Sequence, residues 1–249
     1  MRKFFLVFLC LLYLFAGCAT KDIKNMDAKA YLEKGLKYYD SKKYKKAAEN
    51  LEEAIKYADS PSIAAKAQLY LGNAYFKDKN YLEAIPSYKQ FLDYYPDAPE
   101  APDVLYKLGL SYYKQINTFD REQQTTVDAI NTFNELKSQY PSYANSKNID
   151  KYISELKEKL AEKELYIAEF YFRTNKDEAA EKRLKYIIDH YENTNIYKKA
   201  LIRYCKYLSS NKHRKQEALV FLNRLLNSTT ENEAYAKDIS ELLEKLRNM

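Results

Sequence analysis

Apolar and polar positions along this chain follow the period of an α-helix. Between Tyr81 and Tyr95, for example, Ala84, Tyr88 and Phe91 fall on one face, at the spacings of three and four residues that indicate a helix with one buried side. A short polar turn at residues 77–80 separates this segment from an earlier one with the same period. The alternation typical of strands is missing, and the chain has only 4 Gly and 6 Pro. The pattern therefore predicts an all-α protein.

The helical segments recur at a fixed interval. Gly35, Gly72 and Gly109 are separated by two steps of 37 residues, and internal similarity at such a period indicates stacked helical units. Because a Gly within a helix costs about 1 kcal/mol relative to Ala, we expect each Gly to be required by a close contact between helices. The same offset relates further sets of residues, namely Tyr38, Tyr75 and Tyr112; Tyr39, Phe76 and Tyr113; Tyr44 and Tyr81; and Ala47 and Ala84.

This unit resembles the tetratricopeptide repeat, which is a pair of helices. In that family a small residue on the first helix lets an Ala of the second helix pack closely. The aromatic residue one turn later fills the space between neighbouring units, so Tyr38, Tyr75 and Tyr112 are expected to be packing residues. The resemblance implies a tetratricopeptide-repeat superhelix of about five helix pairs with a C-terminal capping helix.

Less regular segments complete the predicted organisation. Residues 28–141 hold repeats 1–3, with an insert at about 114–124 in the third. Residues 142–249 hold a connecting helix, repeats 4 and 5, and the cap. The connecting helix is expected to run unbroken from about Ser146 to Arg173, because no helix breaker lies between them. In repeat 4 Ala168 takes the place of the Gly, and the cap is an amphipathic helix from roughly Glu231 to Leu246.

The chain begins with the layout of an export signal. A basic start, MRK, precedes an unbroken apolar stretch from Phe4 to Phe15, which is shorter than the ~20 residues that span a bilayer. Ala16-Gly17-Cys18 then resembles a bacterial lipobox, although Phe15 stands where Leu is usual. We predict a signal peptide at residues 1–17, a lipid anchor with acyl chains such as palmitate on Cys18, and a lipidated flexible tether at 18–27.

The residue after the lipobox bears on localisation. Ala19, not Asp, follows Cys18, and the usual sorting pattern of lipoproteins then implies the outer membrane, with the chain anchored by lipid and facing the periplasm.

Cys10 lies in the signal peptide, so Cys205 is left alone in the folded part. No internal disulfide is expected, and Cys205 is predicted to be a small buried side chain.

Composition and charge argue for binding rather than catalysis. The net charge of +6 is small, and bases are interleaved with acids, as in Glu33/Lys34, so we expect solvated helix faces and no nucleic acid. Neither His190 nor His213 has a partner at metal-ligand spacing. Phosphate-binding loops and nucleophile elbows are also missing from the sequence. We predict no catalytic residue, no metal and no cofactor.

The first helices of the repeats are expected to line the inner wall of the array. Counting around these helices from each Gly places apolar and aromatic side chains on that wall, with a Lys directly after two of the aromatics. The predicted groove residues are Leu32, Leu36, Tyr39, Leu69, Asn73, Phe76, Lys77, Tyr106, Leu110, Tyr113 and Lys114. An aromatic groove with a basic rim suits an extended peptide that ends in an aromatic residue and a carboxylate. Packing of the same aromatics between helices is the alternative, and the sequence leaves both open.

Several irregular features together resemble the BamD family of outer-membrane β-barrel assembly lipoproteins. They are the lipobox, the Asp120-Arg121-Glu122 insert in repeat 3, and the repeat-4 segments Leu160-Ala161-x-x-Glu164 and Ala179-Ala180-x-x-Arg183. The chain departs from the family at Asp177, where an aromatic is usual. It departs again at Tyr191-Glu192-Asn193-Thr194, where the family has Tyr-Pro-Asp-Thr.

The resemblance implies a role in assembling β-barrel proteins into the outer membrane. The first repeats would bind unfolded outer-membrane proteins, and the later repeats would bind the periplasmic domains of the core barrel-forming subunit. Arg183 stands where the family places a partner-contacting base. Two other roles remain open. One is the coordination of cell-wall synthesis or envelope constriction, and the other is that of a pilot lipoprotein for a secretin or pilus.

Overall fold

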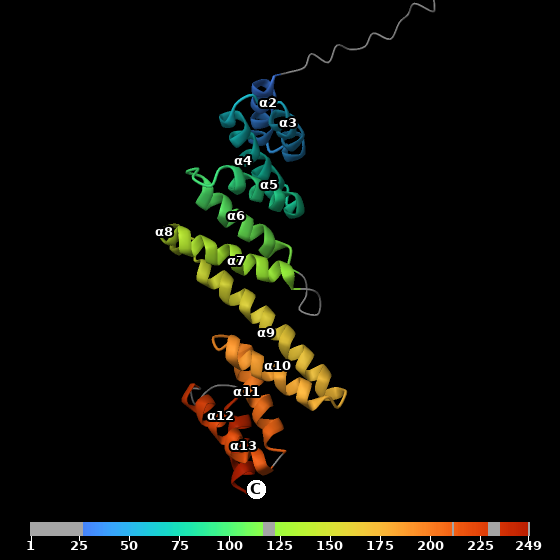
Figure 1. Cartoon of the computed structure of the whole chain (residues 1–249), viewed down its shortest axis with the longest axis vertical. Helices are drawn as coiled ribbons and strands as arrows, with labels where there is room; N and C mark the ends of the chain where they lie inside the picture. Colours follow the sequence, from blue (N-terminus) through green and yellow to red (C-terminus); the bar gives the residue numbers. More distant parts are fainter. Residues whose placement is uncertain (1–26, 117–122, 211, 229–234, 249) are drawn as a thin grey trace, which may run out of the picture. The chain divides into compact units, whose positions relative to one another are not determined.

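The computed structural model describes residues 27–116, 123–210, 212–228 and 235–248, and every regular element in these ranges is helical. The prediction of an all-α chain of five helix pairs and a final helix is confirmed (Figure 1). The helices are α2 (Ala28–Asp40), α3 (Tyr44–Lys56), α4 (Pro61–Lys77), α5 (Tyr81–Tyr94), α6 (Ala101–Lys114), α7 (Gln124–Gln139), α8 (Pro141–Ser146), α9 (Ile149–Arg173), α10 (Asp177–His190), α11 (Asn195–Leu208), the 3₁₀ turn η1 (Lys212–Arg214), α12 (Lys215–Ser228) and α13 (Ala236–Arg247).

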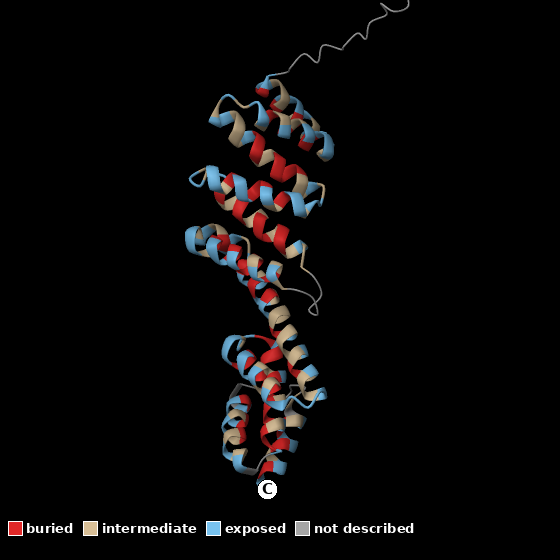
Figure 2. Ribbon diagram, turned by 45° about the vertical axis from the view of Figure 1, so that its right-hand side comes forward, coloured by how far each residue is buried: buried red, intermediate tan, exposed pale blue. Residues whose placement is uncertain are grey.

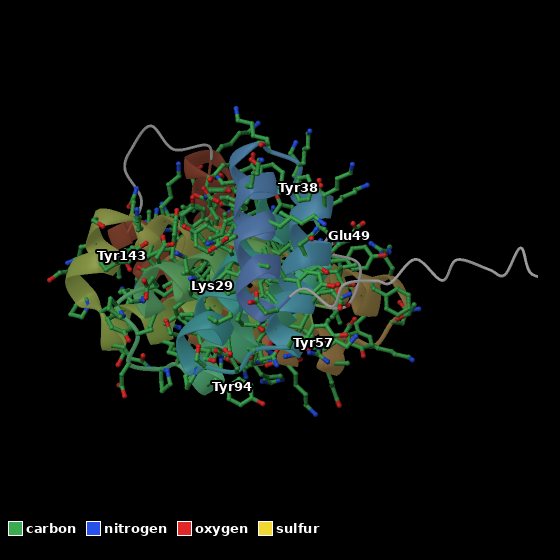
Figure 3. The ribbon with its side chains drawn as sticks, turned by 90° about the horizontal axis from the view of Figure 1, so that it is seen from above. Lys29, Tyr38, Glu49, Tyr57, Tyr94 and Tyr143 are labelled. Atoms are coloured by element: carbon green, nitrogen blue, oxygen red, sulfur yellow. The ribbon has the colours of Figure 1, made fainter. Side chains whose placement is uncertain are left out.

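Two compact units divide the chain within α4, between Leu71 and Gly72. In the first unit, α2 packs on α3 through buried Leu32 and Gly35 on one side and Leu51 on the other. The carboxylate of Asp27 accepts a hydrogen bond from the Ala30 N–H at 2.7 Å, which caps α2. At one end of this pair the rings of Tyr31 and Tyr57 stack with centroids 5.9 Å apart, while Tyr38 lies at the other end (Figure 3).

The second unit contains the rest of α4 and all later helices. From Gly72 onward α4 packs on α5, and the further helix pairs are α6–α7, α9–α10 and α11–α12, followed by α13. The long helix α9 contacts α7 and α8 near its start and α10 and α11 further along (Figure 1). Buried positions form stripes along the facing sides of these helices (Figure 2), as expected for amphipathic helices that bury their apolar face against one another.

Each repeat Gly faces one bulky side chain of the second helix. A Cβ atom at Gly35 would lie 2.8 Å from Leu51 Cγ, at Gly72 it would lie 2.7 Å from Tyr88 Cδ1, and at Gly109 it would lie 2.5 Å from Phe133 Cε1. The prediction that a close approach requires each Gly is therefore confirmed. The opposing residue was expected to be an Ala, and that detail is wrong: the opposing side chain stands four positions after Ala47, Ala84 and Ala129 respectively.

The spacing of these contacts also locates the insert in repeat 3. Gly35 and Gly72 each precede their opposing residue by 16 positions, whereas Gly109 precedes Phe133 by 24. The third separation is longer by eight, which matches the extra residues inferred from the sequence. Residues 117–122 of the insert lie outside the described ranges.

The turns within the pairs share one geometry. Lys42, Lys79 and Asn175 have positive φ angles of 58°, 61° and 56°, and the first two are 37 residues apart. After each of them, a backbone N–H reaches back to a carbonyl five residues earlier: Lys43 to Tyr38 at 2.9 Å, Asn80 to Tyr75 at 2.9 Å and Lys176 to Tyr171 at 2.9 Å. This is the Schellman arrangement, which satisfies carbonyls at the end of a helix.

The connecting helix begins later than the sequence predicted. Residues 141–146 form the separate short helix α8, and α9 begins at Ile149. Between them Asn148 has a φ of 54°, a left-handed conformation that ends a helix and that Asn tolerates better than most residues. The break lets Ala144 and Ile149 both be buried, whereas the end of α9 at Arg173 is as expected.

The last helices close the core of the second unit. Leu242 and Leu246 of α13 join Ala218, Leu222 and Leu225 of α12 in one apolar cluster. Cys205 lies in the same cluster with no exposed surface, and burial raises the pKa of its thiol to about 12. The prediction of a small buried Cys is confirmed. The predicted start of the cap at Glu231 falls outside the described residues, and the described part of the helix begins at Ala236.

Candidate functional site

The predicted groove residues of the first unit are mostly half-buried. Leu32 is buried, whereas Leu36, Tyr39 and Leu69 keep part of their surface. The Tyr39 ring packs edge-on against Tyr70 of α4, with centroids 5.2 Å apart, and against Tyr44 at 5.6 Å. Tyr39 therefore joins the first helix of one repeat to the first helix of the next, and it retains a partly exposed edge.

In the second unit, Asn73 is a packing residue. Its side-chain oxygen accepts hydrogen bonds from the Tyr88 hydroxyl at 3.0 Å and from the Lys107 ammonium at 2.8 Å. Lys107 is also paired with Asp103 of its own helix at 2.6 Å. Because Asn73 is buried and both donors come from neighbouring helices, its amide oxygen is occupied by contacts between α4, α5 and α6.

The adjacent pair Phe76 and Lys77 differs in accessibility. The half-buried Phe76 ring lies 5.5 Å from Tyr81 and 6.4 Å from Tyr88, between centroids. Lys77 is exposed at the end of α4. The aromatic residue therefore contributes to packing, while the ammonium group remains available to a ligand.

Two tyrosines of α6 contact the start of the connecting segment. The Tyr113 hydroxyl donates to Glu155 Oε2 at 2.6 Å, and this hydrogen bond, with burial, raises the pKa of Tyr113 to about 12. Its ring lies 5.2 Å from Tyr152. Burial and a hydrogen bond with Tyr152 likewise raise the pKa of Tyr106 to about 12.

Two lysines cover the aromatic faces in this region. Lys114 is exposed and its Nζ lies 5.6 Å from the Tyr113 ring centroid. The ammonium of Lys147 lies 5.5 Å from the Tyr106 ring and 5.2 Å from the Tyr143 ring, within the range of cation–π attraction. Leu110, the remaining predicted groove residue, is half-buried.

Of the predicted groove residues, Tyr39, Tyr106 and Tyr113 contact the next first helix or the segment that leads to it, whereas Phe76 packs on α5. Which of them contact a ligand stays a prediction. The sequence analysis did not predict Lys107 as a site residue. Its repeat position is that of Tyr70, 37 residues earlier, so the offset could have identified it. Tyr143, Tyr152 and Glu155 could not have been found in this way, because α8 and α9 depart from the repeat spacing.

Arg183, the predicted partner contact, takes part in an internal ion pair. Its Nη1 lies 2.9 Å from Glu164 Oε2, and this hydrogen bond raises the pKa of the guanidinium. The pair joins α10 to α9. Since 42% of the Arg183 side chain is exposed, it remains accessible from outside, and its contact with a partner stays a prediction.

A larger charged cluster, which sequence reasoning missed, joins α10, α11, η1 and α12. Arg214 donates to both oxygens of Glu181 at 2.7 and 2.9 Å and to Glu217 at 2.8 Å. The hydroxyl of buried Tyr204 donates to Glu217 at 2.7 Å. The hydrogen bonds from Arg214 lower the pKa of Glu181 to about 2. Arg214 and Glu217 are three positions apart, but Tyr204 lies 13 positions from Glu217 and Glu181 lies 33 positions from Arg214, so no local pattern indicates the whole cluster.

Some predicted features lie outside the residues that the structure describes. The lipidation site Cys18, the tether and Asp120-Arg121-Glu122 are not among the described residues. Within the described ranges, no three His, Cys, Asp or Glu side chains gather as a metal site would require. No helix in those ranges combines the length and the apolar character needed to cross a membrane.

Comparison with protein families gives a match over most of the chain. The model of the YfiO family, described as outer membrane lipoprotein, matches residues 24–219, which include α2 to α11 and the start of α12 and leave most of α12 and all of α13 beyond the match. No curated protein matches the chain.

Solved structures with similar helical architecture include two tetratricopeptide proteins. A thermophilic tetratricopeptide protein of Thermus thermophilus is 17% identical, with a TM-score of 0.37, over 87% of this chain and 98% of that one. The TPR2AB domain of yeast Sti1, solved as a pHSP90 complex, is 15% identical, with a TM-score of 0.38, over 88% of this chain and 98% of that one. The assignment of the tetratricopeptide-repeat fold rests on the helix pairs described above.

Proposed function

The chain belongs to the YfiO family of outer membrane lipoproteins, and from this premise we propose that it is a component of the β-barrel assembly machinery. YfiO is the family of BamD, so the match over residues 24–219 is the observation that carries the proposal. The protein binds unfolded outer-membrane proteins and the periplasmic domains of the core barrel-forming subunit, and it supports insertion without catalysing a reaction. A lipid on Cys18 anchors it to the outer membrane, facing the periplasm.

Accessible groups for the substrate role lie at the ends of α4 and α6. Lys77 and Lys114 are exposed, and each follows an aromatic residue that is half-buried, Phe76 and Tyr113 respectively. An ammonium beside an apolar surface is suited to the carboxylate and aromatic ring of an unfolded barrel protein's C-terminal segment. The proposed subunit contact at Arg183 uses its exposed side-chain portion.

Depletion of the protein in its own cells tests the role. We expect a general loss of β-barrel proteins from the outer membrane, measured by quantitative proteomics of membrane fractions, with inner-membrane proteins as the internal control. Chaining of cells with normal barrel levels would instead favour the coordination of cell-wall synthesis. Loss of a single appendage would favour a secretin or pilus pilot. Either result would contradict the proposal.

Titration with a peptide that ends in Phe and a free carboxylate tests the substrate surface. The double variant Lys77→Gln/Lys114→Gln is expected to weaken binding about tenfold, because each charge-assisted contact contributes about 1.5 kcal/mol or less at an exposed site. Phe76→Leu keeps an apolar side chain next to Tyr81 and Tyr88 and tests whether peptide binding requires an aromatic ring at this position. Lys45→Gln, an exposed Lys of α3 outside the predicted groove, is the matched control. Unchanged affinity in the double variant would remove the groove from the proposal.

A further inference from the structure

A cavity of about 210 Å³ lies among α9, α11 and α13 of the second unit. Leu165, Ile202 and Tyr235 form its apolar wall. Ile202 is buried, whereas Leu165 and Tyr235 pack against the core cluster and keep part of their surface. Lys199 and Lys206, both exposed, stand at its edge. The cavity thus has an apolar wall and two exposed lysines among its lining residues.

Most of the charges around the cavity are already paired. Arg203 Nε lies 2.8 Å from Glu169 Oε1, and Lys206 Nζ lies 3.0 Å from Asp238 Oδ1. The Arg203 guanidinium also covers the Phe172 ring at 3.6 Å. Lys199 has no ion-pair partner within the described part of the chain, so the lining carries one uncompensated positive charge.

The equivalent junction between earlier first helices is filled by aromatic rings. Where α6 meets α8 and α9, the Tyr106 and Tyr143 rings lie 6.3 Å apart and the Tyr113 and Tyr152 rings 5.2 Å apart. Where α9 meets α11, the Phe172 and Tyr207 rings lie 5.6 Å apart, and the cavity lies beside Leu165 and Ile202. The described side chains of the second unit therefore leave a cavity at this junction.

We propose that this cavity binds the C-terminal residue of a partner protein, with an apolar side chain against Leu165, Ile202 and Tyr235 and the α-carboxylate at Lys199. A single negative charge matches the one unpaired cation, whereas a phosphate dianion would bring a second charge close to Glu169 and Asp238. The volume suits one side chain with its carboxylate and is below that of typical small-molecule pockets. The site is separate from Lys77 and Lys114, and it does not depend on the proposed role in barrel assembly.

Fluorescence anisotropy on the full-length chain in detergent tests the site. The probe is a labelled decapeptide of Gly and Ser that ends in Leu with a free carboxylate, compared with the same peptide as its C-terminal amide. We expect the amide to bind about tenfold more weakly, the effect of losing one charge-assisted contact. Lys199→Gln is expected to weaken binding of the free acid to the level of the amide, and Lys199→Arg to restore it. Lys182→Gln, an exposed Lys of α10 that does not line the cavity, is expected to change nothing.

Two further measurements keep this site distinct from the groove of the proposed function. Lys77→Gln/Lys114→Gln is expected to leave the decapeptide affinity unchanged, and replacing the final Leu by Ser is expected to weaken it. Equal binding of acid and amide, no binding at all, or loss of affinity in Lys77→Gln/Lys114→Gln but not in Lys199→Gln would overturn the inference. Each of these results leaves the depletion experiment unaffected.

Discussion

At the scale of single residues, the repeat glycines act through the side chains that oppose them. Leu51, Tyr88 and Phe133 are each almost completely buried, so none can rotate away from an added methyl group without disturbing a packed core. A Gly in mid-helix is unfavourable by about 1 kcal/mol, and the close approach that it permits more than offsets this cost. The hydrogen bonds around Arg214 are the polar counterpart, because they join η1 to α10 and α12 through the side chains of Glu181 and Glu217.

Gly109→Ala is expected to destabilise the second unit by up to about 2 kcal/mol. Insertion of a methyl group 2.5 Å from Phe133 Cε1 forces overpacking that costs about 1–3 kcal/mol, against a gain of about 1 kcal/mol in helix propensity. Chemical denaturation followed by circular dichroism measures the difference. In a Phe133→Leu protein, which lacks the aromatic ring, Gly109→Ala should cause a smaller loss of stability. A Gly109→Ala protein as stable as the parent would show that the helices can separate freely.

Glu181→Gln is expected to destabilise the α10–α12 region by about 1.5–3 kcal/mol at neutral pH, because the carboxylate loses its charged contacts with Arg214. The pKa of Glu181 is lowered from 4.5 to about 2, so its contribution is complete above pH 4.5 and is lost as the pH falls from there through about 2. The parent protein should therefore lose more stability than the variant over that interval. Amide hydrogen exchange in α10–α12 at several pH values measures this, and Glu178→Gln, on an exposed residue of α10, serves as control.

At the scale of elements, the repeats share a turn in which a Lys takes an unfavourable conformation. Lys42 and Lys79 adopt left-handed φ angles, which cost an L-residue with a Cβ about 1 kcal/mol. The hydrogen bonds from Lys43 to Tyr38 and from Asn80 to Tyr75 hold each turn in this form. The turns set the angle at which the second helix returns onto the first, and they therefore place the Gly opposite its bulky partner.

Lys79→Gly is expected to stabilise the second unit by up to about 1 kcal/mol, because Gly adopts a φ of 61° without strain. Thermal unfolding of the full chain measures the shift, and Lys42→Gly should act in the same direction in the first unit. Asn80→Gly, at a residue with a φ of −84°, should give no gain. A loss of stability in Lys79→Gly would mean that the Lys side chain makes a contact that outweighs the strain of its backbone.

At the scale of the whole molecule, the proposed lipid anchor and the proposed binding groups lie in different parts of the chain. The lipobox Cys18 precedes the family match at residue 24 by several residues, and the proposed binding groups lie in the helix pairs of the second unit. An anchor of several acyl chains holds a protein at a membrane stably, with about 0.8 kcal/mol per buried methylene. Attachment should therefore be removable without unfolding the repeats.

Cys18→Ser is expected to abolish incorporation of labelled palmitate and to remove the protein from the outer-membrane fraction, because the thiol that would carry lipid is gone. Metabolic labelling followed by membrane fractionation measures both effects. Cys10→Ser, within the predicted signal peptide, is the matched control and should leave both unchanged. Retention of label in the Cys18→Ser protein would contradict lipidation at this site.

The sequence by itself determined the helices, their pairing and the places that need Gly, because these depend on local periodicity and on a repeat of 37 residues. It could not reveal that Leu51, Tyr88 and Phe133 oppose the glycines, that Asn148 interrupts the connecting segment, or that Arg214 joins three other helices. Such contacts depend on how helices far apart in sequence are oriented, and many side chains of similar size satisfy the same helical pattern. The cavity beside Lys199 also belongs to the tertiary structure, since an unfilled space is a property of several helices together.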